Sequence, residues 1–476
     1  MSTKPQPLKT NRWRLNHWNL LGSIQSASQG VKMIKTPRIE RVSVDDLMSL
    51  ATDQGTTPMQ VGVILMMDTS AGLDTARFID AINRRLPAIP RLRQCLVDAP
   101  FGCGRPIWVD DADFKITSHV SVKQCPTSAG MDVVLELAAG LLTTRLSRDR
   151  SLWAAILIPD VNPDQSALVL IVHHVLADGI AGLAILAGLV DGASEVLDPQ
   201  FPRRQPTRAA LFWDALSDNV RALRQLPATL VRFGQALTQL GPALRSRPVR
   251  SSLNRITGSQ RRFAAVGCVL ADIHTVAHQH GGTVNDVMLS AITGALHRLL
   301  MGRGEPTNGF VVSIPFSARQ RTTAQKLGNQ SGVIPLWLPG TGTPLERLSA
   351  VAGITRTAKT KTSARGASTA LLVPLFRLLS RIGLFQWFIE HQRSIQTFVS
   401  SMKGPVTTLS VDGFPILDLV PLSVAIGNVT VSFVVLSYAG KLTVTLSADP
   451  ESCPDLSDLQ TFLIEDLESL TKTLRA

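Results

Sequence analysis

The chain has 476 residues, of which 45% are hydrophobic and 18% are charged, and its formal net charge is +12 at pH 7. This apolar content excludes a disordered chain and is sufficient for one large or two medium hydrophobic cores. Five scattered cysteines without a CxxC pair argue against a disulfide framework or a zinc ribbon, and no apolar run reaches the ~20 residues of a membrane-spanning helix.

The first segment, residues 1–40, is predicted to be a basic tail. Residues 1–39 hold seven Lys or Arg and no acidic residue. The segment has no apolar stretch of the kind found in a secretory signal, so we expect a cytoplasmic protein. Trp13 and Trp18 lie among basic residues, which is compatible with an interfacial anchor.

Residues 41–196 alternate helix-like and strand-like stretches and are predicted to form an N-terminal domain. Ser43 followed by Asp45 and Asp46 indicates the capped start of a helix. The other elements expected here are a strand at 61–67, a helix at 73–85, two buried strands at 152–158 and 167–172 that pair through a turn, and a helix at 183–190.

Residues 197–262 differ in character and are predicted to be an arginine-rich helical crossover between two domains. Prolines interrupt amphipathic pieces such as 211–223, and residues 201–262 hold twelve Arg and two Asp. The tail and the crossover carry the whole positive excess, so the rest of the chain is mildly acidic. Localised positive charge favours an anionic partner, which could be nucleic acid, a membrane surface or a phosphorylated substrate; the alternative is a solvated tail and a solvated linker.

Residues 263–476 repeat the mixed pattern and are predicted to form a C-terminal domain. The expected elements are a helix at 285–301, a strand at 310–315, strands at 429–436 and 441–446 joined by a hairpin turn at 437–440, and a closing helix at 456–474. The fold class expected for the whole chain is therefore α/β, with mixed sheets in both domains.

The chemically most informative stretch is an apolar strand that ends in His173 and His174 and turns through Asp178 and Gly179 into a helix. Adjacent strand residues face opposite sides, so one histidine faces an open site and the other packs behind it. A partly buried histidine with a pKa near neutral suits general-base catalysis at pH 7. Asp178 can orient the loop through an arginine or through backbone amides, and Gly179 permits close approach of a ligand.

Two other interpretations of this stretch stay open. The histidines could be core residues before an ordinary Asp-Gly turn. Alternatively, His174 and Asp178 could supply two metal ligands, but the only further Glu, His or Cys nearby is His173, which should point away. We therefore expect no metal.

The HHxxxDG pattern of residues 173–179 resembles the active-site motif of the CoA-dependent acyltransferase superfamily. From about residue 42 to 474 the chain resembles, more narrowly, the bacterial wax ester synthase/diacylglycerol acyltransferase family. The narrower resemblance is carried by blocks that occur in that family's order: 58–62, 105–119, 151–153, 253–261, 283–289, 313–319, 328–329, 400–405 and 437–440. Gln60, Ser151 and the pair Ser401-Met402 replace residues of the family pattern, all outside the catalytic motif.

The resemblance implies a two-domain chloramphenicol-acetyltransferase-like fold with an active-site tunnel between the domains. It implies that His174 deprotonates an acceptor hydroxyl for attack on an acyl-CoA thioester, without a covalent enzyme intermediate. No cofactor is expected, since acyl-CoA is a co-substrate. Asp178 would hold the loop through a salt bridge, with Arg319 as the candidate partner. Within the catalytic motif, His173 would have a structural or secondary role, and the Gly179 region would be a candidate for the oxyanion donors. Asn285 and Asp286 would be supporting residues, although they fit an ordinary helix start equally well.

Three functions are compatible with the sequence. The first is transfer of a long-chain acyl group from acyl-CoA to diacylglycerol or to a long-chain alcohol. The second is a condensation-type acyltransferase that uses carrier-protein thioesters, and the third is a catalytically weak relative that coats lipid droplets. We expect a cytoplasmic protein that visits the inner membrane face or lipid droplets. The candidate segments for this contact are 209–245 and 370–388, although ordinary core helices are the favoured interpretation of 370–388. Nucleic acid is not expected, because aromatic residues make up only 5% and no base-reading motif occurs.

Overall fold

Two large mixed sheets form the framework of the protein. The computed structural model describes residues 39–43, 46–53, 55–125, 130–193, 198–224, 251–317, 331–365, 379, 382–424 and 426–472. Within these ranges, two sheets have six strands each and a third has two strands. Residues 39–476 form one compact unit. The predicted tail up to residue 38, part of the predicted crossover (225–250) and most of the apolar segment 370–388 lie outside the described residues.

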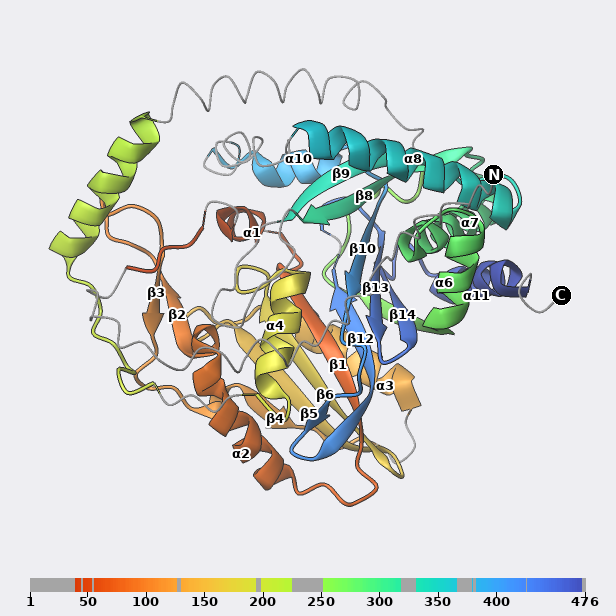
Figure 1. The fold of residues 1–476 in the computed structure, drawn as a ribbon. Helices are drawn as coiled ribbons and strands as arrows, with labels where there is room; N and C mark the ends of the chain where they lie inside the picture. Colours follow the sequence, from red (N-terminus) through yellow and green to blue (C-terminus); the bar gives the residue numbers. More distant parts are fainter. Residues whose placement is uncertain are drawn as a thin grey trace, which may run out of the picture. The chain divides into compact units, whose positions relative to one another are not determined.

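The first sheet has the strand order β11-β12-β1-β6-β5-β4 (Figure 1). β5 and β6 pair antiparallel and are joined by a turn at residues 163–164, which confirms the two paired strands expected from the sequence. The strands are β1 (Gln60–Asp68), β4 (Val120–Val122), β5 (Trp153–Asn162), β6 (Gln165–His173), β11 (Ser410–Val411) and β12 (Phe414–Ser423).

Helices cover both faces of this sheet, because successive strand residues point to opposite sides. Leu157 and Leu170 share one apolar cluster with α2 and α4, whereas Ile156 and Val169 share another with α3. Two residues of β7, Phe263 and Ala265, also pack against the α3 cluster. α3 therefore lies between the first sheet and the edge of the second. These helices are α2 (Thr75–Arg85), α3 (Gly130–Thr143) and α4 (Gly179–Leu189).

The second sheet has the order β7-β14-β13-β10-β8-β9 and is covered by α6, α7, α8 and α11, which share one buried apolar cluster with its strands. The predicted strand at 310–315 and the hairpin at 437–440 are confirmed. The elements are β7 (Arg262–Val269), α6 (Leu270–Gln279), α7 (Val284–Gly302), β8 (Gly309–Ser317), β9 (Ser331–Pro339), α8 (Pro344–Arg365), β10 (Thr397–Lys403), β13 (Val431–Tyr438), β14 (Lys441–Ala448) and α11 (Leu456–Lys472).

One segment from the C-terminal part of the chain joins the first sheet. β12 comes late in the sequence, within the range predicted as the C-terminal domain, yet it pairs antiparallel with β1 of the first sheet. The domain ranges predicted from the sequence did not include this placement of β12. The β11–β12 hairpin turns through Asp412 and Gly413, with φ angles of 49° and 83°, which is the conformation of a two-residue turn for which Asp-Gly is favoured.

Two side chains, the half-buried Asp191 and the buried Tyr438, hold the β11–β12 hairpin. Asp191, just beyond α4, accepts hydrogen bonds from the Ser410 hydroxyl at 2.6 Å and from the backbone N–H groups of Asp412 and Gly413 at 3.0 and 2.9 Å. Tyr438, at the end of β13, accepts from the Leu409 N–H at 2.8 Å and donates to the Ile416 carbonyl at 2.9 Å. The hairpin is thereby tied to both sheets.

The remaining described elements are short, apart from a helix in the crossover. Residues 208–224 are helical, which agrees with the amphipathic piece expected at 211–223. No helix within the described residues has the length and apolarity required to span a bilayer. The other elements are α1 (Asp46–Thr52), β2 (Gln94–Val97), β3 (Ile107–Asp110), α10 (Phe385–His391) and three 3-10 turns (Leu86–Ala88, Pro90–Arg93 and Ile116–Ser118).

Candidate active site

His173, the last residue of β6, is held behind the sheet by two contacts. Its Nδ1 accepts a hydrogen bond from the Val175 N–H at 3.0 Å, so the ring proton of a neutral His173 lies on Nε2. Nε2 lies 3.3 Å from Oδ2 of Asp53, a contact at ion-pair distance that does not meet the geometry of a hydrogen bond. With both ring nitrogens engaged and its side chain only 4% exposed, His173 is placed as a structural residue.

Asp53 anchors this arrangement, and no motif or spacing in the sequence pointed to it. Its side chain is 2% exposed and lies 2.5 Å from Nη1 of Arg145, and its Oδ1 accepts the Met59 N–H at 3.0 Å. Burial raises the pKa of Asp53, but the contacts with His173 and Met59 and the charge of Arg145 outweigh it, so the pKa is lowered overall. Asp53 is therefore a buried carboxylate at neutral pH.

His174 has different surroundings. Its backbone N–H donates to the Met59 carbonyl at 2.8 Å, its side chain is partly exposed, and its Nδ1 lies 3.5 Å from the Ser49 hydroxyl of α1. Burial lowers the pKa of His174, and the charges of Asp178 and Asp46 only partly oppose this effect. The imidazole is consequently neutral at pH 7, as a general base must be.

Ser49 is a second residue near His174 that sequence reasoning missed, since it lies far from the motif along the chain. We predict that Ser49→Ala lowers kcat about fivefold and leaves KM nearly unchanged, because one weak hydrogen bond of about 1 kcal/mol steers the ring. Steady-state kinetics would measure this, with the exposed Ser457→Ala as the matched control. An unchanged kcat would show that the hydroxyl does not orient His174.

Asp178 caps the helix that follows the motif. Its Oδ1 accepts the Ala181 N–H at 2.9 Å, so the second of the two partners expected from the sequence, a backbone amide, is present. Arg319, the candidate salt-bridge partner, lies outside the described residues, and that pair stays a prediction.

Gly179 lies where the second sheet meets the motif. A Cβ built on it would lie 2.2 Å from Sδ of Met402 on β10. β6, which leads into the loop that carries His174, pairs antiparallel with β1 of the first sheet. On the other side, the loop contacts the Met402 side chain of the second sheet. This position fits a site built from both sheets.

The pair Asn285-Asp286 forms the start of α7. Thr283 and Asp286 make a reciprocal capping box, in which Asp286 accepts the Thr283 N–H at 2.8 Å. The other carboxylate oxygen of Asp286 accepts the Thr355 hydroxyl of α8 at 2.7 Å. Asp286 thus has the ordinary helix-start role that the sequence left open, whereas the buried Oδ1 of Asn285 has no hydrogen-bond partner among the described residues.

Gln60 pairs with His173 across β1 and β6 and is fully hydrogen-bonded. Its amide nitrogen donates to the carbonyls of Leu142 and Thr144 at 2.7 and 3.0 Å, and its oxygen accepts the Leu146 N–H at 3.0 Å. A glutamine at this position therefore ties the end of α3 to the sheet below the motif.

We predict that Gln60→Ala lowers the free energy of unfolding by about 2–3 kcal/mol, because it removes the donor to the buried Leu142 carbonyl and the acceptor for the Leu146 N–H. Urea unfolding followed by circular dichroism would measure the change. Gln279→Ala, at an exposed position, is the control and should leave the midpoint unchanged. A Gln60→Ala midpoint equal to that of wild type would contradict the anchoring role.

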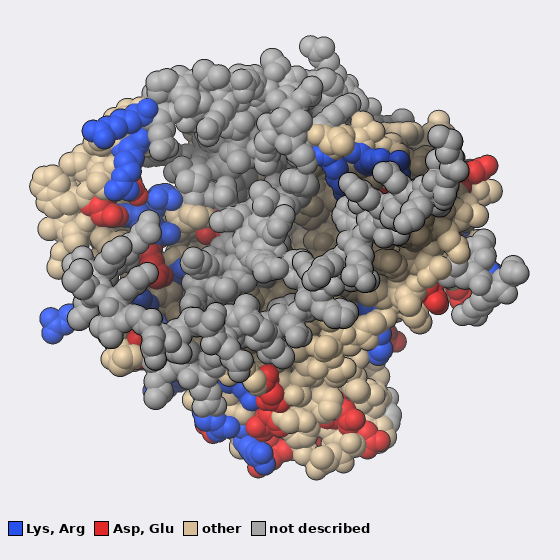
Figure 2. Space-filling view, viewed as in Figure 1, with Lys and Arg blue, Asp and Glu red and all other residues tan. Residues whose placement is uncertain are grey.

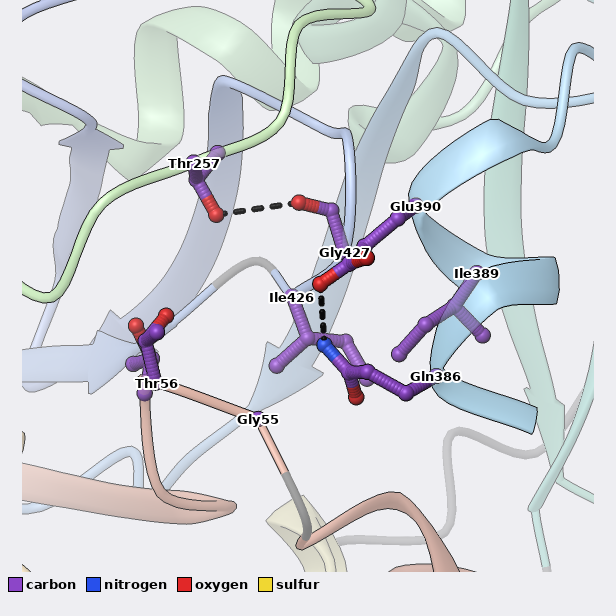
Figure 3. Close-up of a pocket in the computed structure, with 9 residues that line it drawn as sticks. Gly55, Thr56, Thr257, Gln386, Ile389, Glu390, Ile426 and Gly427 are labelled. Atoms are coloured by element: carbon purple, nitrogen blue, oxygen red, sulfur yellow. Dashed lines mark hydrogen bonds between the residues drawn. The ribbon is translucent and has the colours of Figure 1, made fainter. Parts of the chain in front are cut away.

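The described cavities do not reach His174. One, of about 10 Å³, lies among residues 55–57, α10 and residues 426–427 and has room for about one water molecule (Figure 3). Hydrogen bonds beside this cavity connect the N-terminal and C-terminal parts of the chain, since the hydroxyls of Thr56 and Thr57 donate to the Gly258 carbonyl at 3.4 and 3.2 Å. Another, of about 320 Å³, lies between β7, α6 and α11 and contains none of the predicted site residues. The substrate tunnel stays a prediction.

Comparison with known proteins places these residues in a family context. A sequence model of the wax ester synthase/diacylglycerol acyltransferase catalytic domain matches residues 42–288, and the corresponding C-terminal domain model matches residues 327–471. A Mycobacterium tuberculosis protein named as a diacylglycerol O-acyltransferase is 29% identical over 414 residues, which cover 84% of this chain and 89% of the relative. A second M. tuberculosis protein with such a name is 26% identical over 448 residues, covering 88% and 87%.

Solved structures share the fold. The wax ester synthase/diacylglycerol acyltransferase from Marinobacter aquaeolei superimposes with a TM-score of 0.67 at 20% identity, covering 92% of this chain and 100% of that one. The starter condensation domain of rhizomide synthetase, solved with C8-CoA, gives a TM-score of 0.59 at 14% identity and covers 91% and 93%. The mixed α/β architecture expected from the sequence is confirmed.

Proposed function

Because this chain belongs to the wax ester synthase/diacylglycerol acyltransferase family, we propose that it is an acyltransferase that moves a long-chain acyl group from acyl-CoA to the hydroxyl of diacylglycerol or of a long-chain alcohol. The observation that carries the proposal is the partly exposed His174, whose lowered pKa leaves it unprotonated at neutral pH at the end of β6.

In the proposed reaction, the imidazole of His174 takes the proton of the acceptor hydroxyl while the oxygen attacks the thioester carbonyl. The tetrahedral intermediate collapses with cleavage of the carbon–sulfur bond, and the departing CoA thiolate takes the proton back from the imidazolium. Acyl-CoA is the only co-substrate, and no cofactor or covalent enzyme intermediate is required by this sequence of steps.

The neighbouring residues act by positioning. Asp53 and the Val175 amide hold the His173 ring at the end of β6. The backbone N–H of His174 is held by the Met59 carbonyl. Asp178 fixes the start of α4, and Arg319 is proposed as its further partner. The proposed location is cytoplasmic and peripheral, at the inner membrane face or at lipid droplets, where such acyl acceptors reside.

The test is an assay of the purified full chain with palmitoyl-CoA and a panel of acceptors that includes diacylglycerol and hexadecanol, with products identified by mass spectrometry. Formation of triacylglycerol or wax ester supports the proposal. Transfer from a phosphopantetheinylated carrier protein, with little from free acyl-CoA, would instead support the condensation-type reaction. No product with any acceptor would overturn the proposed activity.

A further inference from the structure

The described crossover helix, residues 208–224, carries an apolar stripe that faces solvent. At 100° per residue, Phe212, Leu216, Val220 and Leu223 fall within one quadrant of the helix, with Trp213 at its edge. All five are exposed, Trp213 by 66% and Leu223 by 67%. A surface helix normally buries its apolar stripe, so an exposed one marks an interaction site.

The same helix already has a separate stripe for packing against the body of the protein. Leu211 and Ala215 are buried, and Leu211 shares an apolar cluster with Cys103, Ile107 and Val109. The exposed stripe is therefore a second apolar face.

The two acids of the helix and two of its three arginines lie on different sides, while the third, Arg221, pairs with Asp218. Asp214 accepts the Arg41 Nε at 2.6 Å, and Asp218 lies 3.4 Å from Nη2 of Arg105, so both acids of the helix are paired with arginines of the body. Arg208 and Arg224 are exposed and, by the helical period, flank the apolar stripe on either side. Figure 2 shows basic side chains gathered along the upper part of this helix. The outward face is accordingly apolar and cationic.

A neighbouring loop carries another exposed aromatic side chain near the start of this helix. Phe101 is 99% exposed, and Cys103, two residues later, contacts the Arg208 carbonyl through its Sγ at 3.7 Å. Since Cys103 is buried and Phe101 is not, the loop presents Phe101 close to the start of the helix.

We propose that Phe101 together with Phe212, Trp213, Leu216, Val220 and Leu223 forms a docking surface for an anionic lipid surface. Aromatic and aliphatic side chains enter the boundary between headgroups and acyl chains, while flanking arginines pair with lipid phosphates. The charge complementarity selects anionic lipid over a second copy of this chain, whose corresponding face would be equally cationic. The inference deepens the proposed function and rests on it for the supply of lipid substrates.

The test uses the full chain and sedimentation with vesicles of phosphatidylcholine alone or with 30% phosphatidylglycerol. We expect binding to the anionic vesicles that weakens at high salt, and a drop of about tenfold or more in the partition coefficient for Trp213→Ser/Leu223→Ser. The matched control is Val406→Ser/Met301→Ser, which removes two apolar side chains of similar exposure, 65% and 51%, from elsewhere. Arg208→Gln/Arg224→Gln should weaken binding to anionic vesicles and leave binding to neutral ones unchanged.

Equal binding of the Trp213→Ser/Leu223→Ser protein and wild type would overturn the proposal. A second result would also overturn it: the Trp213→Ser/Leu223→Ser protein has a lower molar mass than wild type by light scattering but binds lipid equally well. The face would then join two copies of the chain. Acyl transfer assayed with detergent-dispersed substrates separates the two ideas. Lost docking with retained transfer supports the surface, whereas absent transfer by wild-type protein that still binds vesicles speaks against the proposed function alone.

Discussion

Substitution of His174 by alanine is expected to lower kcat by about 10²- to 10⁴-fold, the range typical of a positioned general base. The acceptor hydroxyl has a pKa far above 7, so attack on the thioester requires a group that removes its proton as the bond forms. His174→Ala and the control His274→Ala, an exposed histidine on α6, would be compared with palmitoyl-CoA and the acceptor identified by the panel. Undiminished turnover of His174→Ala would refute the mechanism.

The same mechanism has a pH signature in the wild-type enzyme. Burial lowers the pKa of His174, and the base is active only when unprotonated. The ratio kcat/KM should therefore rise with pH through an apparent pKa below the ordinary histidine value and stay level from pH 7 upward. A rise centred above pH 7 would point to a different titrating group.

Asp53→Asn is the second change with a large expected effect, since it removes the negative charge that faces both His173 and Arg145. Breaking a buried ion pair costs about 3–5 kcal/mol, and the 46% exposure of Arg145 reduces this, so we expect a loss of about 2 kcal/mol in the free energy of unfolding at pH 7. We also expect kcat to fall with little change in KM, because the strand end that carries His174 is no longer fixed.

The pH dependence of this loss follows from the lowered pKa of Asp53. A carboxyl with a lower pKa in the folded state contributes stability above its unfolded pKa of about 3.9, and this contribution is lost as the pH falls through the folded value. Urea unfolding of both proteins between pH 7 and pH 3 should therefore show the difference shrinking in acid. The exposed Asp98→Asn is the control, and a difference independent of pH would contradict the role of the charge.

The strands at 152–158 and 167–172 could be predicted because each is a continuous apolar run bounded by polar turn residues, a local signal. β12 could not be assigned to the first sheet in the same way. Its partner β1 lies far upstream, and strand pairing between distant segments leaves no pattern in either segment alone. The pairing of β12 with β1 therefore became visible only in the structure.

The residues of the candidate site also differ in whether a local sequence pattern could reveal them. His173, His174, Asp178 and Gly179 lie within seven consecutive residues, so their chemistry could be recognised as a motif. Asp53, Ser49 and Met402 reach the same place from other elements, and nothing in their immediate sequence distinguishes them. For Asn285-Asp286, the capped helix start was one of two interpretations, and the hydrogen bonds of Asp286 follow that one.

The late arrival of β12 in the first sheet has a consequence for biosynthesis. During translation β1 is made early and its partner strand emerges only near the end of the chain, so β1 keeps an open edge of unpaired N–H and C=O groups for most of synthesis. Pairing of segments so distant in sequence is also slow. A nascent or truncated chain ending before residue 414 is thus expected to bind chaperones or aggregate, whatever the stability of the finished enzyme.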